Sequence, residues 1–379
     1  MMKKILVMAG IVVWVLITVL AVSSGVMIIR GGVPAMREDG VPVKTQNLPC
    51  FDNGVIRVSG HSYKVELRKT AGDEIVVSQY GSKIREDELF AFSQTGDVTE
   101  IAIKPSLRIV SFDFFWYARS LVIEIPESFA GTVNAETTAG GIAVEDSFEW
   151  KEATLKATSG GIRVLNTLTA DKITAEAVSG GVIIDSAVKA GEIQMKTTSG
   201  GIKISNSLTA DKITAEAVSG GVIIDGIVNA DEISLKTTSG GIRTHMPINA
   251  RDLKASTTSG GIRVESAIVE QYTMSSSSGG INVAGISGGG SVKTNSGGVR
   301  MALINPTGEL KVTTSSGGIR LSIQEDLSFR MDAKTTSGGI RGDFPMLKDD
   351  NSATASIGEN PTVDLILRAT SGGIRVEFE

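Results

Sequence analysis

Two consecutive copies of a 20-residue unit occupy residues 160–199, with the sequence GGIRVLNTLTADKITAEAVS followed by GGVIIDSAVKAGEIQMKTTS. Each copy opens on a Gly-Gly pair, and apolar residues then alternate with other residues in short segments. A repeat with a period of about 20 residues and short alternating segments is typical of a solenoid, in which each unit packs on its neighbours. These two units therefore predict a repeat architecture.

The Gly-Gly motif recurs far beyond these two copies. Its first glycine returns at a constant spacing from Gly140 to Gly260, and then less regularly at Gly279, Gly297, Gly317, Gly338 and Gly372. Glycine adopts positive φ at little cost, so we expect the pairs to form structural turns between short strands. The predicted turn glycines are Gly140, Gly141, Gly160, Gly161, Gly180, Gly181, Gly200, Gly201, Gly220, Gly221, Gly240, Gly241, Gly260 and Gly261.

Three apolar rows keep the same phase in successive units. Ile173, Ala175 and Ala177 precede a Gly-Gly pair, a second row begins directly after the pair at Ile162, and a third includes Leu168. Alternation with a period of two places such side chains on one side of a strand. The pattern predicts an all-β fold, a single-stranded β-solenoid (β-helix) with coils of about 20 residues and three short inward faces.

Charged residues give a second indication of stacking. Four residues before each first glycine the sign alternates from unit to unit, in a charge ladder formed by Glu136, Lys156, Glu176, Lys196, Glu216 and Lys236. Parallel strands stack about 4.8 Å apart, so each charge would face opposite charges. Three residues after the first glycine, cations alternate with apolar side chains at Arg163, Ile183, Lys203, Ile223 and Arg243.

The N-terminal region predicts a membrane anchor. Residues 1–4 form a basic tail, and residues 5–29 contain no charged side chain. About 20 apolar residues suffice to cross a bilayer, so we expect a transmembrane signal-anchor over residues 5–29. A signal peptide cleaved at Ala21-Val22-Ser23 is the alternative. We expect a single-pass protein of the cell membrane, with its C-terminal domain outside the cytoplasm.

The remaining segments divide by composition. We predict a linker over residues 30–48, a β-rich N-terminal cap region over residues 49–130, and the β-solenoid repeats over residues 131–379. An irregular insertion at about residues 341–368 interrupts the period.

Composition weighs against several function classes. The net charge is −5 and no basic stripe is evident, so we expect no nucleic-acid partner. With two histidines and one cysteine, the sequence offers no metal or Ser-His-Asp constellation, and we expect neither a cofactor nor enzymatic activity. The Gly-Gly turns also lack the Lys-Ser/Thr of a phosphate-binding loop. A polysaccharide-active β-helix enzyme, using carboxylates such as Asp185 and Asp225, is a remote alternative.

The segment Leu121–Pro126, LVIEIP, is followed by repeated copies of TSGGIRV, as at residues 158–164. Together these motifs resemble the bacterial "putative adhesin" family of β-strand repeat proteins, over roughly residues 51–379. The resemblance implies a β-solenoid at the cell surface or in the envelope, and it brings no catalytic or binding residues with it. We therefore expect a membrane-anchored, adhesin-like interaction module with a protein or glycan ligand. A self-associating envelope scaffold or a sensor partner is the alternative.

Overall fold

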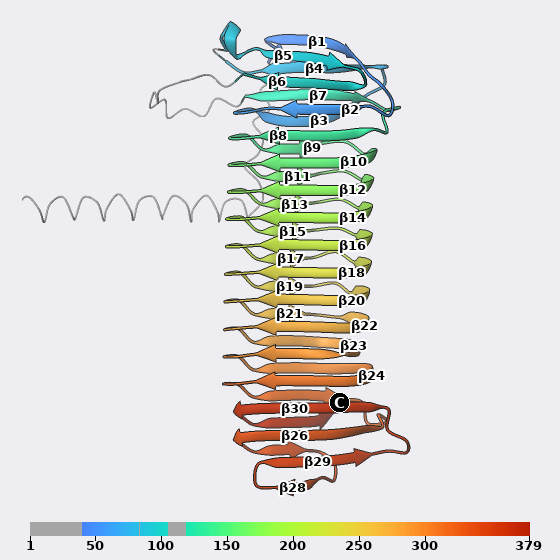
Figure 1. The fold of residues 1–379 in the computed structure, drawn as a ribbon, viewed down its shortest axis with the longest axis vertical. Coiled ribbons are helices and arrows are strands. Elements are labelled where there is room, and N and C mark those ends of the chain that lie inside the picture. The colour runs from blue at the N-terminus through green and yellow to red at the C-terminus, as the bar shows by residue number, and fades with distance from the viewer. Residues whose placement is uncertain (1–39, 83, 105–118) are drawn as a thin grey trace, which may run out of the picture. The chain divides into compact units, whose positions relative to one another are not determined.

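The computed structural model describes residues 40–82, 84–104 and 119–379. The chain divides into two units, Met1–Val41 and Pro42–Glu379. The second unit is an all-β solenoid, as predicted, and its strands stack in one continuous series (Figure 1). The predicted basic tail and transmembrane segment lie outside the described residues. In the ranges that are described, no helix is long and apolar enough to span a membrane.

Each regular coil contains one long and one short strand. The long strand β12 (Leu168–Ala177) pairs in parallel with β10 (Phe148–Ala157) and β14 (Val188–Thr197), so that each residue faces its counterpart in the next unit. The short strand β13 (Val182–Ile184) pairs in the same way with β11 (Ile162–Val164) and β15 (Ile202–Ile204). The stack continues through β16 (Leu208–Ala217), β17 (Val222–Ile224), β18 (Val228–Thr237), β19 (Ile242–Thr244), β20 (Ile248–Thr257), β21 (Ile262–Val264), β22 (Ala267–Ser276), β23 (Ile281–Thr294), β24 (Val299–Thr314) and β25 (Ile319–Ile323).

The core is a narrow apolar column inside the coils. Along β12, Leu168 and Ala170 are buried, the alternation shifts by one residue at Asp171 and Lys172, and Ile173 is buried again. All three predicted apolar rows are thus buried through the regular coils, but they lie on two strands per coil. The row of Leu168 was also predicted to include Ile268, and this was wrong: the spacing shortens there, so Ala267 is buried opposite Ile248 and Ile268 is exposed. The row of Leu168 and the row of Ile173 share one long strand, because pairing with the neighbouring coils continues on both sides of the shift.

The Gly-Gly pairs lie between the long and the short strand of each coil, but the predicted reason for them was wrong. Of the twelve pairs, all within the described residues, Gly338 alone has a positive φ, at 148°. What requires glycine is close approach between coils: a Cβ on Gly200 would lie 2.2 Å from the carbonyl oxygen of Gly180. Gly160 meets Gly140 in the same way, at 2.0 Å. No side chain fits at these distances, whatever the backbone angles.

Buried hydroxyls tie neighbouring turns together. Thr197 Oγ1 accepts a hydrogen bond from the backbone N–H of Gly200 at 3.1 Å and donates one to the carbonyl oxygen of Gly180 at 2.7 Å. The same two bonds recur at Thr257, Ser276, Thr294 and Thr314. These inward hydroxyls are therefore satisfied, as buried polar groups must be to avoid a desolvation cost.

The first coil of the chain is enclosed by later strands. The N-terminal strands are β1 (Lys44–Pro49), β2 (Val55–Ser59), β3 (Lys64–Thr70), β4 (Glu74–Tyr80), β5 (Phe90–Thr95), β6 (Val98–Ile103), β7 (Ser120–Pro126), β8 (Thr132–Thr137) and β9 (Ile142–Val144), with the short 3-10 helix η1 (Glu86–Glu88) before β5. Strand β2 pairs with β6 on one side and β8 on the other, and β3 likewise lies between β7 and β9. The antiparallel strands β1, β4 and β5 complete this end.

The predicted linker over residues 30–48 ends too late. Its last five residues belong to β1, where Leu48 is buried and faces Ile75 of β4. A short apolar-polar alternation is enough to form a strand where a partner edge is available.

At the C-terminal end, as at the N-terminal end, the strands do not stack in the order of the sequence. It comprises β26 (Phe329–Ser337), β27 (Ile340–Gly342), β28 (Leu347–Asp349), β29 (Ser352–Ile357), β30 (Val363–Ser371) and β31 (Ile374–Phe378). Strand β30 lies between β24 and β26, and β31 lies between β25 and β27. The last coil in sequence is thus enclosed by earlier ones. Residues 341–368, predicted as irregular, hold the antiparallel hairpin β28–β29 beside β26 and the start of β30.

Candidate functional site

The predicted charge ladder lies on the outer side of the long strands. In the ladder Lys156 faces Glu136 and Glu176, as the regular repeat requires. Ion pairs join Lys156 Nζ to Glu176 Oε2 at 3.7 Å and Lys196 Nζ to Glu216 Oε2 at 4.0 Å. None of these four side chains is buried, so each pair contributes at most about 1 kcal/mol and the ladder serves mainly to keep the register.

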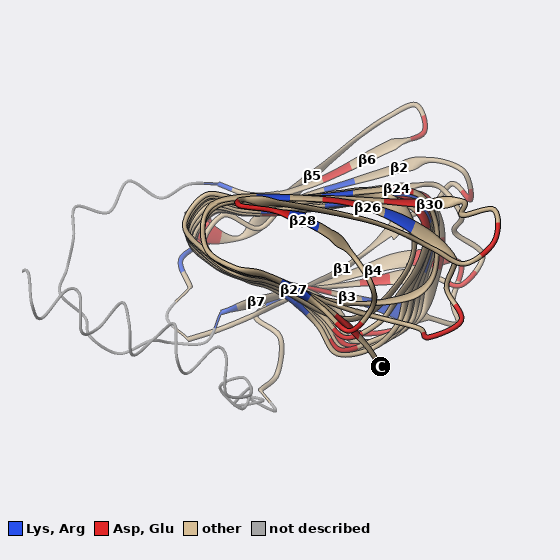
Figure 2. Cartoon of the chain, turned by 90° about the horizontal axis from the view of Figure 1, so that it is seen from below, with Lys and Arg blue, Asp and Glu red and all other residues tan. Residues whose placement is uncertain are grey.

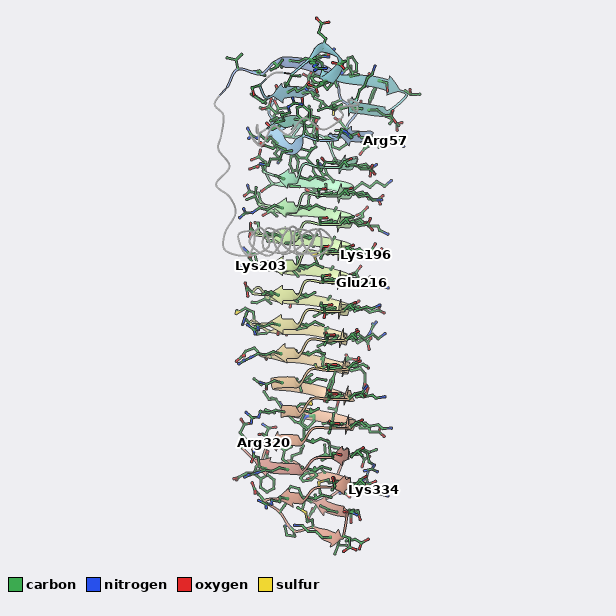
Figure 3. The ribbon with its side chains drawn as sticks, turned by 90° about the vertical axis from the view of Figure 1, so that its left-hand side faces the viewer. Arg57, Lys196, Lys203, Glu216, Arg320 and Lys334 are labelled. Atoms are coloured by element: carbon green, nitrogen blue, oxygen red, sulfur yellow. The ribbon has the colours of Figure 1, made fainter. Side chains whose placement is uncertain are left out.

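A second charged row runs along the short strands, at the position three residues after each first glycine. In stacking order it contains Arg163, Ile183, Lys203, Ile223, Arg243, Arg263, Asn282, Arg300, Arg320, Arg375 and Arg341. Figure 3 shows Lys203 and Arg320 on the side of the stack opposite Lys196 and Glu216. Seen along the stack, Lys and Arg gather near β27 (Figure 2).

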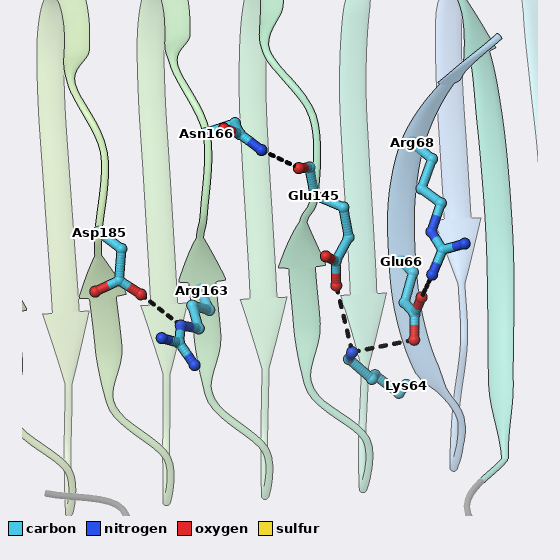
Figure 4. A network of polar contacts seen from close by, with 7 residues as sticks. All are labelled: Lys64, Glu66, Arg68, Glu145, Arg163, Asn166 and Asp185. Atoms are coloured by element: carbon cyan, nitrogen blue, oxygen red, sulfur yellow. Dashed lines mark hydrogen bonds and ion pairs between the residues drawn. The ribbon is translucent and has the colours of Figure 1, made fainter. Parts of the chain in front are cut away.

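In the N-terminal half of this row the cations are neutralised. Arg163 Nε lies 2.5 Å from Asp185 Oδ2, and Lys203 Nζ lies 3.5 Å from Asp225 Oδ2. Each carboxylate comes from the next coil, two residues after that coil's own member of the row. In the coils before Arg163, Lys64 Nζ likewise lies 3.5 Å from Glu145 Oε1 (Figure 4). In this half, the cations of the row form ion pairs that connect neighbouring coils.

In the C-terminal half fewer of the cations form ion pairs. Within the described ranges, no ion pair or side-chain hydrogen bond is formed by Arg243, Arg263, Arg300 or Arg341. The position that supplies a carboxylate to Arg163 is occupied by Ala284 in the coil after Arg263 and by Ser322 in the coil after Arg300. Glu265 and Asp343 occupy it in the coils after Arg243 and Arg375, but among the described residues neither forms an ion pair with an arginine of the row. Arg320 and Arg375 share one carboxylate, Glu377, at 3.9 and 2.7 Å.

We call Arg243, Arg263, Arg300, Arg320, Arg375 and Arg341 the arginine row. Arg243 faces Arg263 directly, Arg320 lies between Arg300 and Arg375, and Arg375 also faces Arg341. All six side chains are exposed. Like charges directly opposite each other destabilise a sheet, so this arrangement opposes the stability of the fold.

A groove of about 1100 Å³ follows the arginine row. It is lined by glycines of eight successive coils, including Gly241, Gly261, Gly318 and Gly339, and by all six arginines. The glycines leave space above the backbone, and the guanidinium groups stand beside it. A guanidinium group donates paired hydrogen bonds to a carboxylate or phosphate, so the groove is equipped to bind an extended anion.

Sequence reasoning missed most of this site. It followed the row only as far as Arg243, where cations still alternate with apolar residues. The signal that could have found the rest is the tripeptide Gly-Ile-Arg or Gly-Val-Arg, which ends at each of the six arginines in the arginine row.

The carboxylates considered for a polysaccharide-active enzyme, Asp185 and Asp225, form contacts with side chains of adjacent coils. Asp225 Oδ1 lies 2.6 Å from His245 Nδ1, a contact of adjacent coils that the regular repeat could have revealed. Asp185 binds Arg163 and accepts a hydrogen bond from Ser205 Oγ at 3.2 Å. In the part of the chain that the structure describes, no group of three or more His, Cys, Asp or Glu residues could hold a metal ion.

Comparison with solved structures found several chains of similar description. The chain is similar to a "putative adhesin" from Parabacteroides merdae, at 13% identity, covering 89% of this chain and 95% of that one with a TM-score of 0.37. A "putative adhesin" from Parabacteroides distasonis is 13% identical, with coverages of 90% and 98% and a TM-score of 0.34. A "putative cell adhesion protein" from Clostridium sporogenes is 9% identical, with coverages of 89% and 98% and a TM-score of 0.22.

No curated protein matches the sequence. The family model described as Toastrack DUF4097 matches residues 54–247 and 208–377, which together span most of the repeat region and the N-terminal strands. The family resemblance predicted from the LVIEIP segment and the Gly-Gly units is thereby confirmed. The chain belongs to the Toastrack DUF4097 family.

Proposed function

We propose that this protein is a membrane-anchored, non-enzymatic, adhesin-like binding module of the cell surface or envelope. The observation that carries the proposal is the arginine row. Its charges are largely uncompensated within the described residues, and it lines a groove of about 1100 Å³. Residues that destabilise the fold and form no compensating contact are expected at functional sites. A rigid stack of coils is suited to hold such a surface in one geometry.

The anchor and the orientation are the second part of the proposal. They rest on the uncharged run at residues 5–29 and the basic residues before it. In this arrangement the N-terminal tail lies in the cytoplasm and the solenoid lies outside it, where a ligand of the surroundings can reach the groove.

Fractionation of cells that express the full chain tests this part. We expect the protein in the membrane fraction, released by detergent and not by alkaline carbonate, and degraded when protease is added to intact cells without their outer barriers. The matched control lacks residues 2–29 and should be soluble and protected. A full chain found in the soluble cytoplasm would refute the proposal. A mature N-terminus close to residue 24 would instead establish the cleaved-signal alternative.

A further inference from the structure

We propose that the arginine row binds one extended chain of an acidic polysaccharide that carries a carboxylate on each sugar. The inference rests on the proposed function as a binding module, and it adds the site and the chemical class of the ligand. The row is a single file: one guanidinium group per coil, with Asn282 as its one interruption between Arg263 and Arg300.

The dimensions of the row favour a linear polymer. Successive coils rise by about 4.8 Å, so the six steps from Arg243 to Arg341 span roughly 29 Å. This rise is close to the length that one pyranose adds to an extended glycan. The carboxylates that such a chain turns toward the groove would therefore recur at nearly whole numbers of coils, and each could pair with a guanidinium group of the row.

Other extended anions fit less well. Phosphates follow each other at about 3.4 Å along one strand of B-form DNA, and a duplex presents two such rows. Single-stranded nucleic acids also bind through aromatic stacking, and no aromatic residue of the described ranges lines the groove. In an extended acidic peptide, side chains on one face recur at roughly 6.7 Å. Neither spacing is close to a whole multiple of the step of about 4.8 Å in the single file.

The ligand would also account for the electrostatic cost of the row. Arg320 has like-charged neighbours on both sides, Arg300 and Arg375, and it shares Glu377 with Arg375. A bound polyanion would place counter-charges along the row and relieve this repulsion. The same feature predicts that binding weakens steeply as salt screens the charges.

Binding of polygalacturonate oligomers to the full chain in non-ionic detergent tests the proposal. We expect measurable affinity at low salt, a steep decrease with added sodium chloride, and no binding of neutral dextran. In the double variant Arg263→Gln/Arg300→Gln the affinity should fall at least tenfold. Neither residue forms an ion pair in the described part of the chain, so the variant removes charge without breaking a contact.

The matched control is Lys254→Gln/Lys311→Gln, which changes the net charge by the same amount on exposed positions of the long strands β20 and β24. Its affinity should stay within twofold of the unmodified chain. An equal loss in both variants would mean attraction to net charge and would overturn the site. Preference for a DNA oligonucleotide over polygalacturonate, or no binding to either, would overturn the ligand class.

Thermal unfolding separates loss of binding from loss of fold. The arginine variant should melt at or above the temperature of the unmodified chain, because it removes like-charge contacts with Arg243 and Arg320. A lower melting temperature would contradict the electrostatic argument. Fractionation tests the anchor independently, so a chain that binds the glycan but stays in the cytoplasm would refute the proposed function alone.

Discussion

At the scale of single residues, the first glycine of each pair has the strictest requirement in the molecule. A Cβ on Gly200 would lie 2.2 Å from the carbonyl oxygen of Gly180, whereas a Cβ on Gly201 would lie 3.1 Å from that of Gly221. At 2.2 Å, the backbone could accommodate a Cβ on Gly200 only if the two coils moved apart. We expect Gly200→Ala to lower the free energy of unfolding by about 3 kcal/mol or more, and Gly201→Ala by about 1 kcal/mol.

Urea denaturation followed by circular dichroism measures this difference. Gly72→Ala is the matched control, because the nearest atom to its Cβ would be Thr70 Oγ1 at 3.6 Å and the site is exposed. Its effect should stay within about 0.5 kcal/mol. Equal losses for Gly200→Ala and Gly201→Ala would show that turn flexibility, and not close approach, selects glycine here.

The single cysteine provides a pH-dependent prediction. Burial, and to a lesser extent the charge of Asp52, raises the pKa of the Cys50 thiol from 9.0 to about 11. The thiolate is the reactive form, so its fraction at pH 8 falls roughly 100-fold for a shift of about two units. Alkylation of the folded chain by iodoacetamide at pH 8 should be slower by about that factor than in guanidinium chloride, and should accelerate about tenfold per pH unit until the pH reaches the raised pKa.

Asp52→Asn distinguishes the two causes. Because burial is the larger one, this variant should recover only a minor part of the lost rate. Folded and unfolded chains that react at the same rate at pH 8 would contradict the raised pKa of the thiol.

At the scale of strands, the position of the last coil is the feature that hydrogen exchange can check. Strands β30 and β31 have a parallel partner on each side, so their amides are enclosed in the ladder. We expect peptides from residues 363–378 to exchange as slowly as those from β24 and β25. Strand β28 pairs only with β29 among the described residues and should exchange quickly. Faster exchange in residues 363–378 than in residues 347–349 would place the last coil at the edge.

Sequence periodicity could predict the coil but not the order of the coils at the ends. The unit at Gly338 and the unit at Gly372 both continue with Gly-Ile-Arg, so either is equally suited to stack on Gly317. The long segment between Gly338 and Gly372 leaves enough chain for the hairpin β28–β29 and a return, and the structure uses it to insert Gly372 between Gly317 and Gly338. At the other end, β2 and β6 lack the Gly-Gly motif, so their pairing could not be predicted from a repeated pattern in the sequence.

The candidate site could not be predicted from the sequence for a related reason. Each Gly-Ile-Arg copy alone is a turn with one exposed cation, and a surface cation is ordinarily uninformative. It becomes a site only when Arg300, Arg320 and Arg375 lie side by side with a single carboxylate, Glu377, that ion-pairs with two of them. That requires the coil order, including the exchanged last coil, which the sequence does not reveal.

At the scale of the whole stack, the question is whether the ends allow one solenoid to extend another. Open strand edges promote such growth unless they are short, charged or covered. At the C-terminal end, β28 is a short strand, and Lys348 and Asp349 follow Leu347, which is 81% exposed. Two charges beside one exposed apolar residue are a common protection against edge pairing. We therefore expect the full chain in detergent to remain a monomer across a concentration range, in light scattering after size-exclusion chromatography.

The charges of β28 should be what prevents association. Replacing both, as Lys348→Val/Asp349→Val, makes the edge a continuous apolar strand and should produce oligomers that grow with concentration. Lys189→Val is the control, since Lys189 is exposed on β14, which has parallel partners on both sides, and it should stay monomeric. Oligomers of the unmodified chain would favour the alternative of a self-associating envelope scaffold. Oligomers that persist after β28 is given further charges would place the contact elsewhere on the stack.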